Sequence, residues 1–257
     1  MKKIIHLSDL HIGFPDCGDR FSRIVRDINF LKEPASNYVV VVTGDIVDSA
    51  FDGKNYGEAK ALLDCLRGFD VLVVPGNHDY GSGSLGLPRF VKEFKKTFFD
   101  APKQVYPKLD IIEGVAFLGL DSMAEEVHWY DSLWANGELG EDQLTRLRTA
   151  LKSKEVRACE KVVVYLHHHP FDPAPFHELK DAAALGDALQ GSAKRVDALL
   201  YGHNHQGKIR NGKWGIPRCY DAGSSTRKMG SAGFHRIIDL SRDPRFDYDA
   251  NFHCEQA

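Results

Sequence analysis

The sequence predicts one α/β domain in which two mixed sheets pack together. In the first half of the chain, short apolar runs rich in β-branched residues alternate with segments of helical periodicity, which is typical of βαβ units and a largely parallel sheet. In the second half this order changes, and the chain ends in short extended runs separated by glycines, which predicts antiparallel pairing. No repeat, low-complexity tract or linker interrupts the sequence, so we expect a single domain over residues 1–257.

The predicted elements can be placed in order along the chain. The first half predicts strands over 3–8, 38–43 and 70–75, with helices over 19–32, 56–67 and 88–98. Two extended segments, 109–113 and 115–120, flank Gly114 and predict a hairpin. The second half predicts helices over 140–151 and 177–190, strands over 161–166 and 197–201, and an antiparallel end from Lys208 onward.

Composition limits the class of protein. An apolar content of 43% is enough for a substantial core, and no segment has the roughly 20 apolar residues of a membrane helix. Asp9 and His11 interrupt the apolar start too early for a signal peptide. The five cysteines show no CxxC spacing, which favours a reducing, cytoplasmic compartment. A net charge of −3 argues against a dedicated nucleic-acid binder, and we expect no membrane partner.

Short polar signatures recur in a fixed order, and most of them follow a predicted strand. They are Asp9-Leu10-His11, Gly44-Asp45, Gly76-Asn77-His78-Asp79, His167-His168-His169 and Gly202-His203-Asn204-His205. Open α/β sheets place their sites at the C-terminal ends of strands. On extended backbone, residues i and i+2 face the same way, so the Asp-x-His and His-x-His pairs can each converge on one cavity. Carboxylate, imidazole and amide groups together bind first-row divalent metals, and the chain has no cysteine cluster for a structural thiolate site. The sequence therefore predicts a metalloenzyme.

In this order, the five signatures resemble the sequence blocks of the calcineurin-like metallophosphoesterases, over residues 9–205. The resemblance implies a four-layer α/β/β/α sandwich, in which two mixed sheets are flanked by helices and a two-metal site lies at the strand ends. It implies two divalent ions, or iron with a divalent ion, drawn from manganese, iron and zinc. Carried onto this chain, it gives one metal to Asp9, His11 and His205, gives the other to Asn77, His168 and His203, and makes Asp45 the bridge between them.

The histidine run offers three neighbouring candidates for one ligand. The family places its ligand two residues before a proline where the block reads His-x-Pro, so Pro170 selects His168. On a strand, His167 and His169 would face opposite to His168, and either one would be a ligand only if His168 is not. Of these two, His169 is the one expected at the rim of the pocket.

The resemblance also implies a mechanism. Two metals roughly 3.5–4 Å apart clamp a phosphoryl group and activate a bridging hydroxide, so no serine or cysteine nucleophile is required. His78 corresponds to the family histidine that neutralises or protonates the leaving oxygen, a role that suits imidazole. Asp48 matches the carboxylate that orients this histidine. The alternative for Asp48 is a helix N-cap or an ordinary loop carboxylate.

A further resemblance concerns the kind of ester. The segment Leu120-Asp121-Ser122, followed by Gly137-Glu138-Leu139-Gly140 and Gln143-Leu144, resembles the class III cyclic-nucleotide phosphodiesterase branch, although Gln143-Leu144 also fits an ordinary amphipathic helix. It implies a small phosphodiester substrate, with a nucleotide as one candidate. The alternatives are a phosphomonoesterase or phosphoprotein phosphatase, a nuclease of the same fold, and an inactive metal-dependent scaffold. The last is disfavoured because every ligand position and His78 are filled.

Two segments outside these signatures carry predictions of their own. Between Gly207 and Gly230 the chain has six basic residues, which form either a solvated face or a positive rim that attracts a phosphorylated substrate. The connection 123–136 contains Trp129, Tyr130 and Trp134, which either stack on a nucleobase or form a small hydrophobic cluster.

Overall fold

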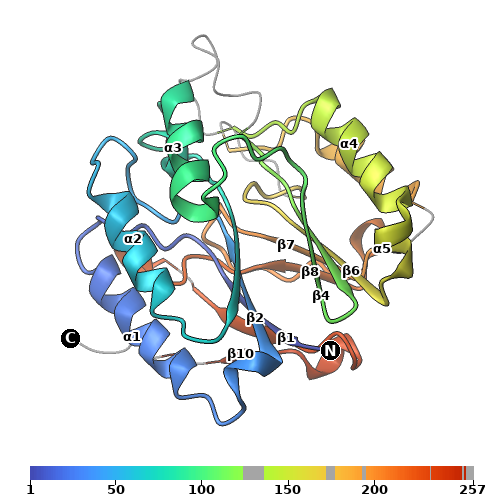
Figure 1. Cartoon of the computed structure of the whole chain (residues 1–257), viewed down its shortest axis with the longest axis horizontal. Coiled ribbons are helices and arrows are strands. Elements are labelled where there is room, and N and C mark those ends of the chain that lie inside the picture. The colour runs from blue at the N-terminus through green and yellow to red at the C-terminus, as the bar shows by residue number, and fades with distance from the viewer. Residues whose placement is uncertain (124–135, 172–176, 193–194, 232, 251, 253–257) are drawn as a thin grey trace.

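Two five-stranded sheets pack face to face, and helices cover the outer face of each (Figure 1). The computed structural model describes residues 1–123, 136–171, 177–192, 195–231, 233–250 and 252. The aromatic residues of the 123–136 connection lie outside the described residues. The residues on either side of this connection are described. Ser122 contacts the ring of His168, and Gly137 lies against the same ring.

The first sheet has the strand order β10-β9-β1-β2-β3. Its centre is parallel, because β1 (Lys3–Leu7) pairs with β2 (Tyr38–Thr43) and β2 pairs with β3 (Asp70–Val74). β9 (His235–Ile238) lies antiparallel to β1, and β10 (Tyr248–Ala250) lies antiparallel to β9. The chain therefore returns to the first sheet at its end.

The second sheet has the order β4-β5-β6-β7-β8. β4 (Lys108–Ile112) and β5 (Val115–Gly119) form the predicted hairpin. The remaining strands run parallel to β5: they are β6 (Lys161–Tyr165), β7 (Ala198–Tyr201) and β8 (Arg218–Asp221).

The helices fall into two groups, one for each sheet (Figure 1). The first sheet is covered by α1 (Cys17–Asn29), α2 (Asn55–Asp64) and α3 (Pro88–Phe99). The second is covered by α4 (Glu141–Lys152), α5 (Lys154–Ala158) and α6 (Ala182–Gln190). Short 3-10 turns complete the described elements: η1 (Ala35–Asn37), η2 (His78–Tyr80), η3 (Lys213–Gly215), η4 (Lys228–Gly230) and η5 (Pro244–Phe246).

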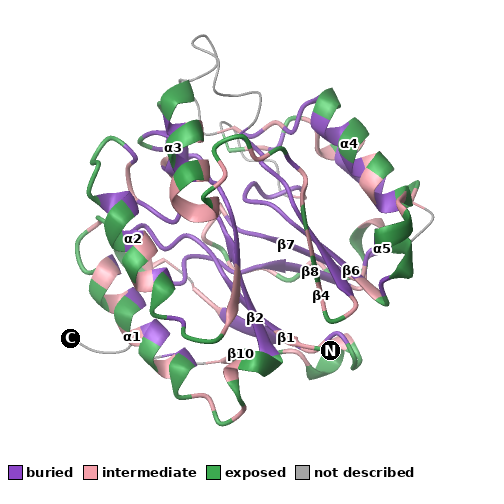
Figure 2. Cartoon of the chain, in the orientation of Figure 1, coloured by how far each residue is buried: buried purple, intermediate pink, exposed green. Residues whose placement is uncertain are grey.

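Strand alternation divides the core into three apolar layers. On β1, Ile5 and Leu7 face the helices of the first sheet, whereas Ile4 faces the second sheet. On β6, Val162 and Val164 face α4 and α6, whereas Val163 faces the first sheet. The central strands of both sheets are buried, whereas the edge strands β4 and β10 and the outer faces of the helices are partly exposed (Figure 2). This arrangement confirms the predicted four-layer sandwich.

Two predicted elements differ from the structure. The helix expected over 177–190 begins at Ala182, because Leu179 pairs with Gly137 and holds the preceding segment in an extended bridge. The antiparallel end expected after Lys208 is only partly antiparallel, since β8 joins β7 in parallel. The connection between β7 and β8 is long enough for such a crossover.

Two other features bear on the expected surroundings of the protein. Among the helices of the described ranges, none combines the length and apolar character needed to cross a bilayer. Four cysteines, Cys17, Cys65, Cys159 and Cys219, are free thiols.

Buried His6 is expected to make the fold sensitive to acid. Its Nε2 atom lies 3.0 Å from the Thr43 hydroxyl, and burial, followed by the charge of Arg236, lowers its pKa from 6.5 to about 3. Between these pH values the native state binds fewer protons than the unfolded chain. The free energy of unfolding should therefore fall by about 2–4 kcal/mol as the pH drops from 6.5 towards 3. Denaturant titrations at several pH values should show a smaller fall for His6→Gln; an equal fall would contradict this origin.

Candidate metal centre

A cavity of about 500 Å³ opens at the C-terminal ends of the central strands. His11 follows β1, Asp45 follows β2, Asn77 and His78 follow β3, and His203 follows β7, and all five line the cavity. The parallel centres of both sheets thus deliver polar side chains to one place, as the sequence predicts.

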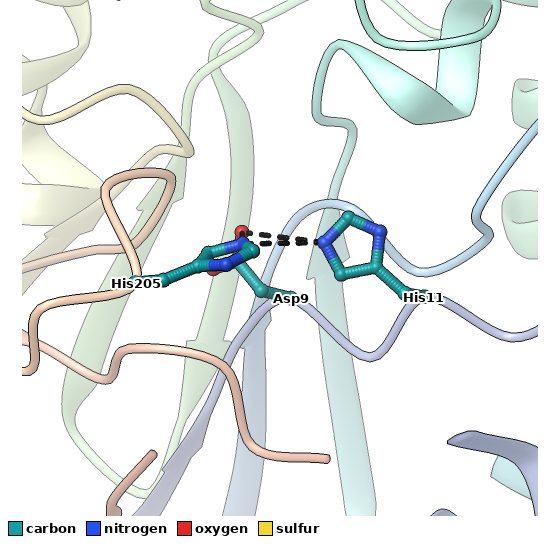
Figure 3. Close-up of side chains that lie close together, drawn as sticks. All are labelled: Asp9, His11 and His205. Atoms are coloured by element: carbon teal, nitrogen blue, oxygen red, sulfur yellow. Dashed lines mark hydrogen bonds and ion pairs between the residues drawn. The ribbon is translucent and has the colours of Figure 1, made fainter. Parts of the chain in front are cut away.

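The first cluster consists of Asp9, His11 and His205 (Figure 3). The Nε2 atom of His205 lies 3.0 Å from Asp9 Oδ1 and 3.2 Å from His11 Nε2. The Nε2 atom of His11 lies 4.0 Å from Asp9 Oδ1. All three side chains therefore point one donor atom at a common centre, and they are the three residues expected to bind the first metal.

The second cluster consists of Asp45, Asn77, His167 and His203. The Nε2 atom of His167 lies 3.0 Å from Asn77 Oδ1, 3.1 Å from His203 Nδ1 and 3.4 Å from Asp45 Oδ2. These distances bring together three residues predicted for this site, with His167 as the fourth.

Asp45 lies between the two clusters. Its Oδ2 atom is 3.4 Å from His167 Nε2 and 3.8 Å from His11 Nε2, so a single oxygen faces both groups. Its Oδ1 atom accepts the backbone N–H of His78 at 2.9 Å. The carboxylate is thus positioned to bridge two ions through Oδ2 while the main chain fixes its orientation.

Hydrogen bonds outside the clusters fix the direction of each donor atom. Thr43 carbonyl lies 2.8 Å from His167 Nδ1, which leaves Nε2 for the cluster. The amide nitrogen of Asn77 donates to the Gly83 carbonyl at 2.9 Å, which turns Oδ1 inward. The Oδ2 atom of Asp9 accepts from the Ser8 hydroxyl at 2.5 Å. Such outer contacts are typical of metal ligands, because they set the tautomer and the orientation of each side chain.

The sequence predicts extended backbone at the signatures, but the structure does not have it there. Asp9, His11, Asp45, His203 and His205 all have φ values between 47° and 75°, in the left-handed region that non-glycine residues seldom adopt. The pairs converge because the chain turns sharply after each strand. Residues held in this region concentrate at functional sites, where the surrounding structure enforces them.

The glycines of the signatures are required by close packing. A Cβ atom on Gly76 would lie 2.2 Å from Asp45 Oδ1. A Cβ atom on Gly202 would lie 1.9 Å from Ser8 Oγ and 2.4 Å from Asp9 Oδ2. Any side chain at these two positions would displace a carboxylate of the cluster.

The pKa values reflect strong coupling within the site. Burial opposes ionisation of Asp45, but the neighbouring His167 and His78 rings hold the pKa of this carboxyl well below its usual range. Burial also disfavours the charged form of His167, yet Asp45, Asp9 and the Thr43 carbonyl together outweigh it and raise the pKa of His167 to about 9. A metal must displace this proton, so metal affinity should increase with pH up to about that value.

The donor set fits a pair of metal ions. When two ligand atoms each lie about 2.1 Å from one ion and the angle between their bonds is a right angle, they are roughly 3.0 Å apart. In the two clusters, four pairs of donor atoms are separated by 3.0–3.2 Å, and the pairs His167–Asp45 and His11–Asp9 by 3.4 and 4.0 Å. Imidazole nitrogens that face one another at this distance repel unless a proton or a metal lies between them. Imidazole, carboxylate and amide oxygen suit manganese, iron and zinc.

Within the histidine run, the structure brings His167 rather than His168 to the second cluster. His168, the predicted ligand, points its Nδ1 atom at the Ser122 hydroxyl, 2.8 Å away, and its ring packs against His203. His167 occupies the position in the cluster instead. His167 reaches the cluster because side chains alternate along the strand. It lies on the same face as Val163, and this face points towards the first sheet. His169 is buried against Tyr201 rather than at the rim.

Alanine variants can separate the two histidines. His167→Ala should lose about one equivalent of metal and most activity, because it removes a donor from the second cluster. His168→Ala should keep both metals and reduce activity far less. Metal content per chain, measured by mass spectrometry after gel filtration, checks this, and the reverse pattern would restore His168 as the ligand.

His78 and Asp48 lie beside the first cluster, but their contact differs from the predicted one. The Nδ1 atom of His78 donates to the backbone carbonyl of Asp48 at 2.5 Å. The Asp48 carboxylate instead lies 3.3 Å from His11 Nδ1 and 2.5 Å from Lys228 Nζ. Asp48 therefore orients His78 through its main chain, and its carboxylate supports the candidate ligand His11.

Among the cavity-lining residues that were not expected at the site, two carry titratable side chains. His177 lies 3.3 Å from His203 Nε2. Lys228 is one of the six basic residues after Gly207 and lines the cavity, whereas Lys213 is exposed outside it. Neither belongs to a recognisable signature, and their proximity to the site arises from the fold.

Comparisons with known proteins bear on the family and on the fold. A family model described as calcineurin-like phosphoesterase matches residues 2–207. No curated protein matches the chain by sequence. Among solved structures, the chain is similar to a dimetal phosphatase from Danio rerio (16% identity, 87% of each chain, TM-score 0.66). It is also similar to a phosphopantetheinyl hydrolase from Mycobacterium tuberculosis (14% identity, 95% of this chain and 98% of that one, TM-score 0.60). A third similar structure is a 5′-nucleotidase precursor from Thermus thermophilus (13% identity, 96% of this chain and 53% of that one, TM-score 0.53).

Proposed function

Because the chain belongs to the calcineurin-like phosphoesterase family, we propose that residues 1–257 form one hydrolase domain that cleaves a small phosphodiester at a dinuclear metal site. A nucleotide is one candidate for this substrate, and a reducing cytoplasm is the expected compartment. The observation that carries the proposal is the position of Asp45 Oδ2 between two clusters of metal-binding side chains.

Seven side chains would hold the metals. One ion would be bound by Asp9, His11 and His205. The other would be bound by Asn77, His167 and His203, and Asp45 would bind both ions. When bound, two such ions supply Lewis acidity and activate water for in-line attack on phosphorus. The remaining work of the chain is to position the ester and to provide a proton.

His78 is the proposed proton donor. Its Nδ1–H group is engaged by the Asp48 carbonyl, so the Nε2 atom is the one available to the leaving oxygen. Gly83 packs against Nε2: a Cβ atom there would lie 2.6 Å away. The absence of a side chain at Gly83 therefore leaves Nε2 accessible from the cavity.

The preference for a diester rests on the resemblance of the segment that begins at Leu120. In the structure this segment packs beside the strand ends that carry the site, and its polar groups contact residues next to the clusters. The Asp121 carboxylate accepts from the Tyr80 hydroxyl at 2.8 Å, and the side chain of Gln143 bonds both the N–H and the carbonyl of Asp121. Ser122 holds His168. These residues carry the resemblance to the phosphodiesterase branch, and none of them lines the cavity.

Two nitrophenyl esters test the proposal. With added Mn²⁺, the protein should hydrolyse bis-p-nitrophenyl phosphate with a higher kcat/KM than p-nitrophenyl phosphate, and EDTA should abolish both activities. A preference for p-nitrophenyl phosphate would instead indicate a phosphomonoesterase. If neither ester is hydrolysed while two metals are bound, the domain is an inactive scaffold.

A further inference from the structure

Lys228 lies at the metal centre but belongs to a segment beyond the family match, which ends at residue 207. Its ammonium group is 2.5 Å from the Asp48 carboxylate and 3.3 Å from His11 Nδ1. The ring of Phe14 covers one side of it at 4.9 Å. With 14% of its side chain exposed, Lys228 is largely withdrawn from solvent and forms part of the cavity wall.

The segment that carries Lys228 is fastened to the first metal-binding strand. Three consecutive residues of this segment bond to three consecutive residues after β1. Ser224 Oγ donates to the Asp9 carbonyl at 2.9 Å, and Thr226 Oγ1 donates to the Leu10 carbonyl at 3.0 Å. Between them, the backbone N–H of Ser225 donates to the Ser8 carbonyl at 2.8 Å.

The local backbone around Lys228 is also constrained. Arg227 and Met229, on either side, both have φ 52°, in the left-handed region. Arg20 on α1 donates to the carbonyls of Thr226 and Arg227, at 3.1 Å each, and so holds this turn in place. Such conformations persist where the surrounding structure enforces them, which is common at ligand-binding positions.

The ammonium group retains hydrogen-bonding capacity for a ligand. If His11 presents Nε2 to the cluster, its Nδ1 atom carries the proton and faces Asp48, so it accepts nothing from Lys228. Asp48 is then the one acceptor of the Lys228 ammonium within the described ranges. An ammonium group has three N–H donors, so further donors remain on the cavity side.

From this geometry we propose that Lys228 binds an anionic oxygen of the substrate and favours phosphodiesters that carry a second negative charge beside the scissile group, as a diphosphate linkage does. The inference rests on the proposed phosphoesterase function and specifies its substrate class. A charged hydrogen bond from a partly buried ammonium strengthens with the charge on the oxygen that it meets. Lys228 is therefore a specificity-determining residue, in addition to its contact with Asp48.

A charge-neutral variant tests this role. The esters p-nitrophenyl phosphate and bis-p-nitrophenyl phosphate share a leaving group but differ by one charge at neutral pH. Lys228→Met should raise KM for p-nitrophenyl phosphate about 10-fold, the loss expected for one charged hydrogen bond, and raise KM for the diester less than about threefold. Lys228→Arg should preserve most of the selectivity, and Lys213→Met, which removes an exposed charge outside the cavity, should leave both KM values unchanged.

A structural role would give a different result. If Lys228 only holds Asp48, and through it His11, then Lys228→Met should lower kcat equally for both esters or lower the metal content. Either outcome would overturn the inference. A readout independent of turnover is calorimetric binding of inorganic phosphate to the Mn²⁺-loaded protein, which should weaken about 10-fold in Lys228→Met. If the wild type hydrolyses neither ester, the proposed function fails, and the phosphate titration still decides the role of Lys228; unchanged phosphate affinity would overturn it.

Discussion

An Asp45→Ala variant is expected to lose at least about 10³-fold in kcat/KM, together with at least one equivalent of metal. The reason is geometric, since Asp45 Oδ2 is the atom that faces both clusters. Its removal would take away the one donor expected to be shared by both metals. Activity assays and metal analysis by mass spectrometry on the same preparation measure both effects.

The matched control is Asp142→Ala, which removes an exposed carboxylate from the first turn of α4. It should bind two metals and turn over normally. The assignment of Asp45 would be contradicted if the Asp45→Ala protein also retained two metals and near-normal turnover.

His78→Ala is expected to lower kcat by about 10²–10⁴-fold while the metal content stays intact, because His78 acts in proton transfer rather than as a ligand. The structure places its Nδ1 atom on the Asp48 carbonyl and leaves Nε2 for the substrate. The loss should be smaller for esters with a nitrophenolate leaving group, which departs without a proton. Alkyl and nitrophenyl esters of the same acid provide the comparison.

Equal losses for good and poor leaving groups would mean that His78 only positions the phosphoryl group. Loss of a metal in this variant would mean that His78 belongs to the metal-binding residues, beside His11 and Asp45, with which it forms a compact group.

Most of the fold could be predicted because apolar periodicity shows which segments are buried. The strand predicted over 38–43 matches β2, and the hairpin around Gly114 matches β4 and β5 to within a residue at each end. The parallel pairing of β8 could not be predicted, since its partner strand is selected by the path of the connection that carries His203 and His205. That path depends on where the folded chain places His203 and His205, which the sequence pattern of this connection does not show.

The candidate site was predictable at the level of its signatures but not in every atom. His167 and His168 differ only in the face of β6 that they continue, and both faces of this strand are apolar. The sequence therefore does not show which face meets the first sheet. The contact of Asp48 with His11 and that of Lys228 with Asp48 both depend on tertiary packing, and the second joins residues 180 positions apart.

The claim that two metals share Asp45 is tested most directly by anomalous diffraction from crystals of the Mn²⁺-loaded protein. We expect two peaks roughly 3.5–4 Å apart on either side of Asp45 Oδ2, one among Asp9, His11 and His205 and the other among Asn77, His167 and His203. A single peak, or two peaks of which neither contacts Asp45, would contradict the dinuclear centre.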